Sequence, residues 1–325
     1  MVHQTDQANH PFDGETPLVS VIIPAFNAAA FVEQTLASVF EQTYPTIEII
    51  VVDDGSTDQT PKILRRHEDR ITLLTQENAG QAAARNRGAK IARGALLCFL
   101  DSDDVFDREK MTQQVQLLGR FDEAVAVYCD YRTIDDAGNI TQEQNALHTL
   151  HPSGDVLESF LRDNNIITPG QVLMRRSAWL NAGGFSEAAV HRGHEDGAFW
   201  PRLALQGPIA YSPETLLSYR RHDAQETQRD DYSLTMSRSR VARLEEVKEA
   251  VYARGDLDLN RFLDRQIFNA HINAAHLSRG HGDWRKAANY ARSAVDARPY
   301  SVSAWRALLS ALTLGSFFRA KETLV

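Results

Sequence analysis

A short apolar run that ends in a cluster of acidic residues constrains this chain most. Residues 95–100 (Ala-Leu-Leu-Cys-Phe-Leu) show no polar alternation, which is typical of a strand buried on both faces of a sheet. Asp101, Asp103 and Asp104 follow directly. In open α/β sheets ligands bind beyond the carboxyl ends of the strands, and crowded carboxylates there favour a cation such as Mg²⁺ or Mn²⁺. The segment therefore predicts an α/β fold with an acidic ligand site, and a solvated helix-capping turn is the alternative.

The segments around this strand alternate between strand and helix patterns. Apolar, strand-like runs occupy residues 19–24, 47–52, 71–75 and 95–100, and helical patterns occupy 28–42, 60–67 and 82–92. This alternation predicts a mostly parallel sheet with helices on both faces. The order is less regular farther on, where we expect strands at 124–130, 171–174, 209–211 and 216–220, a hairpin at 134–140, and helices at 111–118, 156–161, 177–180 and 195–206. The whole is expected to be a mixed sheet flanked by helices.

After about residue 233 the chain has no strand pattern. Helices are expected at 237–254, 260–278, 283–297 and 301–314. Ala275, Ala287, Ala294 and Pro299 have the spacing of one degenerate tetratricopeptide-type helix pair, and a plain helical hairpin packed on the main domain is the alternative. The sequence thus predicts three parts: a flexible tail (1–17), an α/β domain (18–233) and an all-α region (234–325).

The formal charge of −8 is unevenly distributed along the chain. Residues 235–325 contain 15 Lys and Arg against 9 Asp and Glu, a net +6, which leaves −14 for the remainder. The acidic main part argues against nucleic-acid binding. The basic helices are either ordinary solvated faces or a peripheral contact with a membrane or a protein. The last helix carries an apolar stripe of Trp305, Leu308, Leu309 and Leu312, with Phe317 and Phe318 beyond it. This stripe either packs into the core or lies on a membrane surface.

Three further features bear on cellular location. Cys98 and Cys129 both lie in apolar strand-like runs, so we expect buried core thiols rather than a disulfide or a metal site. Residues 1–17 are polar and lack the apolar segment of a signal peptide. No run in the sequence approaches the ~20 apolar residues needed to span a bilayer. We therefore expect a cytoplasmic protein, with peripheral contact at the inner face of the membrane left open.

Five motifs occur in a defined order. They are Val-Ser-Val-Ile-Ile-Pro-Ala-Phe-Asn (19–27), Val-Val-Asp-Asp-Gly-Ser-Thr-Asp (51–58), Glu-Asn-Ala-Gly-Gln-Ala-Ala-Ala-Arg-Asn-Arg-Gly (77–88), Phe-Leu-Asp-Ser-Asp-Asp (99–104), and His-Glu-Asp (194–196) followed by Phe199, Trp200 and Arg202. Together they resemble the family 2 glycosyltransferases, which have a GT-A fold, over residues 18–222. The resemblance implies that a sugar is transferred from a nucleotide diphosphate donor with inversion at the anomeric carbon, assisted by a divalent metal, Mn²⁺ or Mg²⁺.

The resemblance also implies a set of donor-binding residues: Pro24, Phe26, Asn27, Asp53, Asp54, Asn78, Gly80, Arg85, Asp101 and Ser102. In this set Phe26 offers an apolar face to a base and Asp54 offers an acceptor for a base N–H. Such an acceptor favours uracil, and hence a UDP-sugar, or another ring that presents a donor. Arg85 would neutralise phosphate charge. The structural alternatives are helix capping by one of Asp53 and Asp54, and a surface salt bridge for Arg85.

By the same resemblance, Asp103 would bind the metal, with Asp101 and His222 as further ligands. His222 ends the segment Tyr-Arg-Arg-His (219–222), which is similar to the family's Tyr-Arg-x-His stretch. An imidazole ligand suits Mn²⁺ better than Mg²⁺. Asp104 is expected to hold the helix that follows it.

An inverting transfer needs a base that takes the proton of the acceptor hydroxyl. Asp196, with Glu195 beside it, matches the acidic pair from which the family draws this base, and capping of the following helix is the alternative. Just upstream, Gly-Gly-Phe-Ser-Glu (183–187) resembles the family's Gly-Gly-Phe-Asp-Glu. Ser186 departs from that pattern, which leaves the role of the loop open.

By family analogy the expected role is glycan or polysaccharide biosynthesis. The acceptor would be a carbohydrate, a lipid-linked glycan or another hydroxyl compound, with residues 148–168 and the C-terminal helices shaping its site. A nucleotidyltransferase is a weaker alternative, because it needs a glycine-rich basic loop after the first strand and residues 24–28 contain neither glycine nor a cation. A further alternative is a non-catalytic nucleotide-binding or scaffold protein that uses its helical region for partners.

Overall fold

The computed structural model describes residues 16–143, 151–162, 168–222 and 231–322, with side chains as far as Thr313. The chain divides into two compact units. The sheet unit consists of Met1–Glu187 and Arg202–Asp223, and the helical unit consists of Ala188–Pro201 and Ala224–Val325. Most of the tail expected at 1–17 lies outside the described residues, as do parts of the segment 148–168 that we expected to shape an acceptor site.

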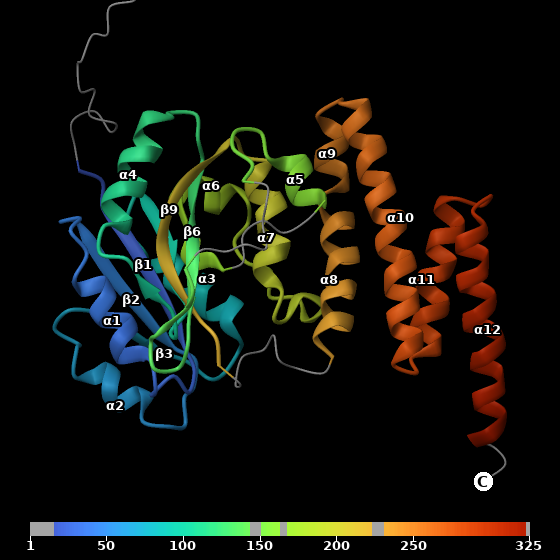
Figure 1. Cartoon of the computed structure of the whole chain (residues 1–325), viewed down its shortest axis with the longest axis horizontal. Coiled ribbons are helices and arrows are strands. Elements are labelled where there is room, and N and C mark those ends of the chain that lie inside the picture. Colours follow the sequence, from blue (N-terminus) through green and yellow to red (C-terminus); the bar gives the residue numbers. More distant parts are fainter. Residues whose placement is uncertain (1–15, 144–150, 163–167, 223–230, 323–325) are drawn as a thin grey trace, which may run out of the picture. The chain divides into compact units, whose positions relative to one another are not determined.

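The sheet unit is built on one mixed sheet (Figure 1). Its strands are β1 (Val19–Ala25), β2 (Ile47–Asp53), β3 (Thr72–Thr75), β4 (Leu96–Phe99), β5 (Val105–Phe106), β6 (Ala126–Ile134), β7 (Ile140–Gln142), β8 (Val172–Arg175) and β9 (Ile209–Arg220). Their order is β3-β2-β1-β4-β8-β6-β9-β5, with β7 beside β6. The four strands β1 to β4 are parallel neighbours, β8 is antiparallel to β4 and β6, and β6 is parallel to β9. The predicted mixed α/β sheet is confirmed.

Helices cover both faces of this sheet. The helices of the sheet unit are α1 (Val32–Phe40), α2 (Thr60–Arg65), α3 (Gln81–Ile91), α4 (Lys110–Arg120), α5 (Leu157–Arg162) and α6 (Arg176–Asn181). Ile23 of β1 lies in one buried cluster with Leu36 of α1 and Met111 of α4. Ile22 points to the opposite face, where its Cγ2 lies 2.5 Å from the position that a Cβ at Gly88 of α3 would take. Strand alternation thus divides the core into two layers, and a glycine lets α3 approach β1 closely.

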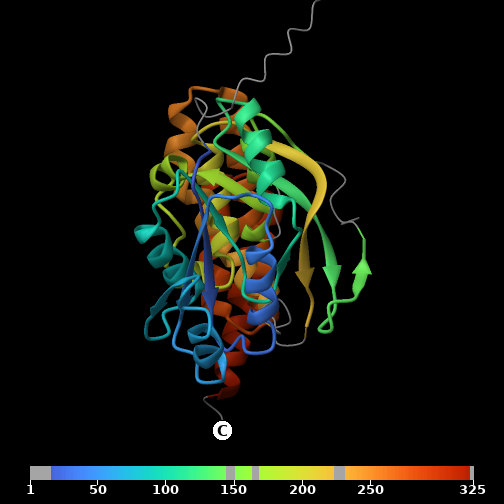
Figure 2. The same cartoon turned by 90° about the vertical axis from the view of Figure 1, so that its left-hand side faces the viewer.

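Two details of the second half of the sheet bear on the expectations. The two short strands expected at 209–211 and 216–220 are one long strand, β9, because its partner β6 continues past the irregular pairing near Asp130. The expected hairpin at 134–140 is confirmed as the connection between β6 and β7. Figure 2 shows this green hairpin beside the long gold strand β9.

Cys98 and Cys129 are buried free thiols in the core, as expected.

The helical unit contains no strand among its described residues. It holds the start of α7 (Glu195–Ala204), and then α8 (Tyr232–Glu246), α9 (Lys248–Ala253), α10 (Leu257–Gly280), α11 (Trp284–Ala297) and α12 (Val302–Glu322). The single helix expected at 237–254 is two helices, α8 and α9, separated at Val247. Helices α10, α11 and α12 pack around a small-residue core that includes Ala275, Ala291, Ala294 and Ala304. Alanine at these positions allows the helix axes to approach closely.

The apolar stripe of α12 is divided between the core and the surface. Leu308 is buried in the same cluster, whereas Trp305, Leu309 and Leu312 are exposed. The side chains of Phe317 and Phe318, which we considered with this stripe, lie outside the described residues. Within the described ranges, no helix combines the length and the apolar character that crossing a membrane requires.

Candidate functional site

The loops after β1 and β2 meet at the carboxyl edge of the parallel strands. Asn27 ties them together: its N–H donates to Ser56 Oγ (2.9 Å), and its Oδ1 accepts from Thr57 N–H (2.8 Å). Asn27 has a φ of +49°, which asparagine tolerates better than most residues. Phe26, just before it, keeps 49% of its surface exposed, so its ring is available to a ligand. Pro24 is part of β1 itself.

The two aspartates at the end of β2 have different surroundings. Both oxygens of Asp54 are used within the protein, since Oδ1 accepts from Gln76 Nε2 (2.7 Å) and Ala79 N–H (2.9 Å), and Oδ2 accepts from Gly80 N–H (2.9 Å). Asp53 Oδ1 accepts a backbone N–H three residues on (3.1 Å), and its Oδ2 has no hydrogen bond to any part of the chain that the structure describes. The geometry therefore differs from the expectation for Asp54, which organises the loop after β3. Both aspartates are 2% exposed, but Asp53 is the one with an oxygen that no described group uses.

Two glycines shape the loops around Asp54. Gly55 has a φ of +78°, and a Cβ there would lie 2.9 Å from the backbone nitrogen of Asn78. Gly80 has a φ of +91° and immediately precedes α3, where its N–H reaches Asp54. Residues with a side chain rarely adopt such φ values, so this arrangement requires glycine at both positions. Asn78, which was expected to contact a donor, is exposed on the loop between them.

Asp101 is held by two side chains from distant parts of the sequence. Arg85 Nη2 donates to Asp101 Oδ1 (2.6 Å) and to Gln81 Oε1 (2.8 Å), and Thr168 Oγ1 donates to Asp101 Oδ2 (3.0 Å). Arg85 is only 2% exposed, so the surface salt bridge considered as its alternative is wrong. A buried guanidinium beside this carboxylate reduces the negative charge that the acidic loop would otherwise accumulate.

Asp103 and His222 form a second pair at the same loop. His222 Nε2 lies 3.0 Å from Asp103 Oδ2, and this hydrogen bond raises the pKa of His222. No group of three or more His, Cys, Asp and Glu side chains is arranged as a metal site among the described residues. One carboxylate and one imidazole are ligand types that suit a divalent transition-metal ion, should one bind here. Asp101, the third expected ligand, is instead paired with Arg85.

Asp104 differs from its expected role. It is wholly buried, and its Oδ1 accepts from the N–H of Arg220 in β9 (3.0 Å), so it holds a strand rather than a helix. Burial, reinforced by the two carboxylates before it in the sequence, raises the pKa of Asp104 well above its usual range. Thr35 of α1 fixes the same loop, because its Oγ1 donates to the carbonyl oxygens of Ser102 (3.0 Å) and Asp104 (2.9 Å).

Asn86 anchors the Gly-Gly-Phe-Ser-Glu loop, although sequence reasoning assigned it no role. Its Oδ1 accepts from Phe185 N–H (2.9 Å), and its Nδ2 donates to Phe185 O (2.8 Å) and Glu187 Oε1 (2.8 Å). Gly184, with a φ of +68°, lies against this side chain, since a Cβ there would be 2.9 Å from Asn86 Oδ1. The side-chain amide of Asn86 therefore holds this loop through the backbone of Phe185 and the side chain of Glu187, not through Ser186.

The acidic pair Glu195 and Asp196 lies in the helical unit, at the start of α7. Glu195 is 2% exposed, whereas Asp196 is partly exposed. Asp196 Oδ1 accepts from the N–H of Gly197 (2.6 Å) at the start of the helix. Of the two acids, Asp196 is thus the one that an external group can reach.

His194, directly before this pair, is expected to make folding stability depend on pH. Burial, followed by the charges of Arg243 and His191, lowers the pKa of His194 to about 4, and the charge of Asp231 acts in the opposite direction. Its Nε2 lies 3.0 Å from Thr235 Oγ1. Between the unfolded value of 6.5 and the folded value of about 4, the unfolded chain binds the extra proton, so stability falls as the pH decreases through that window.

The measurement is the free energy of unfolding in urea at several pH values between 7 and 4, for the wild type and for His194→Gln. Across this window the free energy of unfolding of the wild type should decrease by an amount on the order of 1–2 kcal/mol. His194→Gln should not show this decrease. His276→Gln, at an exposed position of α10, controls for the loss of one histidine. Parallel pH profiles for the wild type and His194→Gln would contradict the assignment.

Comparisons with known sequences identify relatives of this chain. A sequence profile described as Glycosyl transferase family 2 matches residues 20–181. An uncharacterized glycosyltransferase of Rickettsia typhi is 32% identical over 219 residues, which are 65% of this chain and 66% of the relative. WfgD of Escherichia coli, named as a UDP-Glc:alpha-D-GlcNAc-diphosphoundecaprenol beta-1,3-glucosyltransferase, is 43% identical over 103 residues, 31% of this chain and 41% of the relative. The matched part thus spans about two thirds or less of these relatives' length.

Solved structures resemble the fold of nearly the whole chain. TarS 1-349 of S. aureus in complex with UDP-GlcNAc has a TM-score of 0.65 at 17% identity and covers 94% of this chain and 92% of its own. The mannosyltransferase PcManGT of Pyrobaculum calidifontis, in complex with GDP-Man and Mn²⁺, has a TM-score of 0.56 at 23% identity, covering 98% and 86%. At these identities the likeness shows the fold alone. It confirms the expected GT-A type of sheet with a C-terminal helical region.

Proposed function

Because the chain belongs to glycosyl transferase family 2, we propose that it transfers a sugar from a nucleotide diphosphate to an acceptor hydroxyl, with inversion at the anomeric carbon. The observation that carries the proposal is the set of ligand-type groups at the carboxyl edge of the sheet. They are the exposed ring of Phe26, Asp53 with Oδ2 available, and the pair Asp103 and His222. The aromatic ring matches the face of a base, and the carboxylate oxygen matches a base N–H. The metal-type donors match a divalent ion on a diphosphate.

The donor we propose is a UDP-sugar. Uracil presents an N–H that can donate a hydrogen bond to the carboxylate of Asp53. The ring of Phe26 offers uracil a stacking surface. Asp54 supports this site indirectly, by fixing the loop at 76–80 that leads into α3. Two similar proteins favour uridine: TarS has been solved with UDP-GlcNAc, and WfgD is named as a UDP-Glc transferase. PcManGT has been solved with GDP-Man, so the base is a point that the experiment must test.

Asp103 and His222 are the residues that would hold a divalent metal, and their mixed oxygen and nitrogen donors favour Mn²⁺. When bound, the ion would stabilise the negative charge of the departing diphosphate as a Lewis acid. Arg85 has a different task, since its guanidinium is buried against Asp101 and keeps that carboxylate in place. In the loop from Asp101 to Asp104, Asp101 is paired with Arg85, Asp103 with His222, and Asp104 accepts a backbone N–H, so Asp103 is the carboxylate whose partner could itself bind a metal.

Asp196 is the general base that we propose. It is the more accessible acid of its pair, and a carboxylate at this position can accept the proton of an acceptor hydroxyl. For the acceptor we propose a carbohydrate or a lipid-linked glycan in polysaccharide biosynthesis. This choice is supported by WfgD, whose name specifies a diphosphoundecaprenol-linked acceptor.

The test of the donor site is thermal stability with UDP, GDP and their sugars, each with and without Mn²⁺. A ligand at ~100 times its Kd stabilises the folded protein by about 2.7 kcal/mol, which is a readily visible shift. We expect this shift with uridine nucleotides only when Mn²⁺ is present. Asp103→Ala should abolish the Mn²⁺-dependent part of the shift.

Asp69→Ala is the matched control, because it removes an exposed carboxylate elsewhere in the sheet unit. It should retain the full shift. A shift with guanosine nucleotides alone would overturn the uridine assignment. The absence of any nucleotide shift would overturn the donor site and favour the scaffold alternative.

A further inference from the structure

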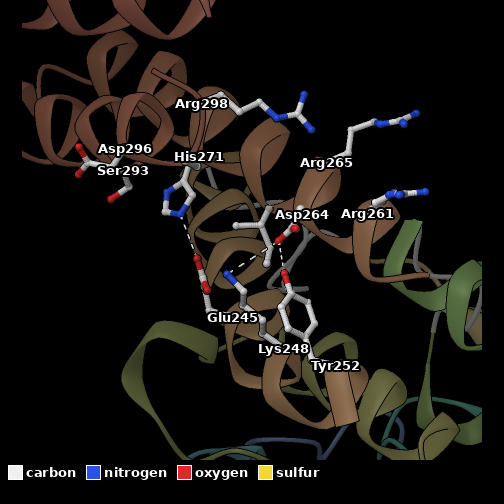
Figure 3. A pocket seen from close by; sticks show the side chains of 12 residues that line it. Glu245, Lys248, Tyr252, Arg261, Asp264, Arg265, His271, Ser293, Asp296 and Arg298 are labelled. Carbon is white, nitrogen blue, oxygen red and sulfur yellow. Dashed lines mark hydrogen bonds and ion pairs between the residues drawn. The ribbon is translucent and has the colours of Figure 1, made fainter. Parts of the chain in front are cut away.

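A cavity of about 760 Å³ lies within the helical unit, among α8, α9, α10 and α11 (Figure 3). Its volume is in the range of pockets that bind small molecules. None of the residues proposed above for donor, metal or base lines it. The lining is mostly charged and includes an aromatic side chain, Tyr252, and a buried imidazole, His271. Such a lining suits a polar ligand with more than one kind of group.

Four cationic side chains border this cavity: Lys248, Arg261, Arg265 and Arg298. Figure 3 shows the three arginines along the upper and right side of the view, with Lys248 and Tyr252 below them. Arg265 has no ion pair with any described residue, and the Arg298 guanidinium lies over the ring of Phe268 (4.8 Å) rather than against a carboxylate. Two guanidinium groups are therefore available to an anion, and guanidinium is well matched to phosphate oxygens.

Three carboxylates also line the cavity, and two of them already have partners. Tyr252 donates its hydroxyl to Asp264, which also lies 3.8 Å from Lys248 Nζ. Glu245 lies 3.3 Å from His271 Nε2. Asp296 has no hydrogen bond or ion pair with the described part of the chain. A lone carboxylate beside arginines would repel a polyanion, but it accepts hydrogen bonds from the hydroxyls of a neutral sugar ring.

His271 supplies an unmatched polar atom at the cavity. Its side chain is 8% exposed, and its Nδ1 is buried with no hydrogen-bond partner among the described residues. Because Nε2 of His271 faces the carboxylate of Glu245, the neutral ring carries its proton on Nε2. Nδ1 is then a hydrogen-bond acceptor. A buried acceptor without a donor carries a free-energy cost, which a ligand hydroxyl would relieve.

From these groups we infer that the cavity binds a phosphorylated carbohydrate, with the phosphate on Arg265 and Arg298 and the sugar hydroxyls on Asp296 and His271. The ring of Tyr252, which is 37% exposed, offers a surface for a sugar face. The phosphate belongs either to a soluble sugar phosphate or to a glycan that carries phosphate groups, and both present the same chemistry. The site does not rest on the proposed transferase activity, because it uses none of the residues of that site.

The test is isothermal titration of the full chain with glucose 1-phosphate, and separately with glucose, inorganic phosphate and a phosphomannan oligosaccharide. A phosphorylated probe should bind at least about tenfold more tightly than glucose or phosphate, because only it engages both sets of groups. The double variant Arg265→Gln/Arg298→Gln should lose at least about tenfold in affinity for that probe. Both arginines are exposed, so the variant should remain folded, which its melting temperature checks.

Arg292→Gln is the matched control, since it removes an exposed arginine of α11 that does not line the cavity. Its affinity for the probe should be within twofold of the wild type. Tight binding of glucose 1-phosphate identifies a soluble sugar phosphate as the ligand, and binding of phosphomannan alone identifies a phosphate-bearing glycan. The inference is overturned if no phosphorylated probe binds, if phosphate alone binds as tightly, or if the double variant binds like the wild type.

Discussion

Replacing Arg220 with leucine is expected to lower the free energy of unfolding by about 3–5 kcal/mol. The Arg220 side chain is wholly buried, and its guanidinium donates to the carbonyl oxygens of Asp103 (2.8 Å), Asp135 (2.6 Å) and Asp136 (3.1 Å) and to Gln34 Oε1 (2.6 Å). Leucine fills part of the volume but leaves these acceptors unsatisfied, and each such loss costs about 1–3 kcal/mol. The expected loss of stability is therefore larger than that caused by most single substitutions in a domain.

The measurement is urea unfolding of the wild type, Arg220→Leu and Arg221→Ala. Arg221 is the next residue in the chain and is exposed, so its variant tests the loss of one arginine at almost the same place. It should change stability by no more than about 0.5 kcal/mol. A change below 1 kcal/mol for Arg220→Leu would show that the buried guanidinium contributes no more than its surface neighbour.

Arg220→Lys tests whether the same residue supports the proposed metal site. A lysine keeps the charge, but its three donors radiate from one atom and cannot reproduce the planar fork that spans four acceptors. We expect a folded protein in which the Asp103 loop is less well fixed, and hence a weaker Mn²⁺-dependent shift with UDP than in the wild type. An unchanged shift would limit the role of Arg220 to stability.

The parallel part of the sheet could be predicted because its signals are local. Each of the first four strands is an apolar run bounded by polar turns, and parallel strands bring their carboxyl ends to one edge. That rule alone placed Phe26, Asp53 and Asp103 on neighbouring loops, as the structure has them. The expectation of two separate closing strands was wrong, because β9 resumes its pairing with β6 after an irregularity at residues 213–214.

The division of labour among the acidic residues could not be predicted, because it depends on distant partners. Asp53 and Asp54 are adjacent and chemically identical, and only the hydrogen bonds from residues 76, 79 and 80 distinguish them. Asp104 is distinguished from Asp103 by a backbone N–H of β9, over a hundred residues later. No local pattern encodes such contacts.

The largest effect on activity is expected from Asp196→Asn. If Asp196 is the general base, the asparagine cannot take a proton, and release of UDP from a UDP-sugar should slow by a factor of about 10²–10⁴. The change is nearly isosteric and replaces a partly exposed side chain, so stability should be little affected. The measurement is UDP release from UDP-glucose and UDP-GlcNAc in the presence of Mn²⁺, with water as the acceptor of the sugar, together with the Kd of UDP.

The decisive feature is the difference between two variants. Asp196→Asn should lose the rate but keep the affinity for UDP within about threefold, because a base acts on the acceptor and contributes nothing to holding the nucleotide. Asp103→Asn should lose both the rate and the Mn²⁺-dependent affinity. Glu249→Gln, which removes an exposed acid of α9, should change neither quantity.

Glu195→Gln separates the two members of the acidic pair. Glu195 is buried, so its replacement should be visible mainly as a lower melting temperature. If Glu195→Gln abolished UDP release in a protein that still bound UDP, while Asp196→Asn remained active, the base would be Glu195. If both variants released UDP at the wild-type rate, the proton would be taken elsewhere, and the helical unit would hold neither catalytic acid. A protein that bound UDP but released none from either UDP-sugar would favour the nucleotide-binding alternative, in which the acidic pair serves only to begin α7.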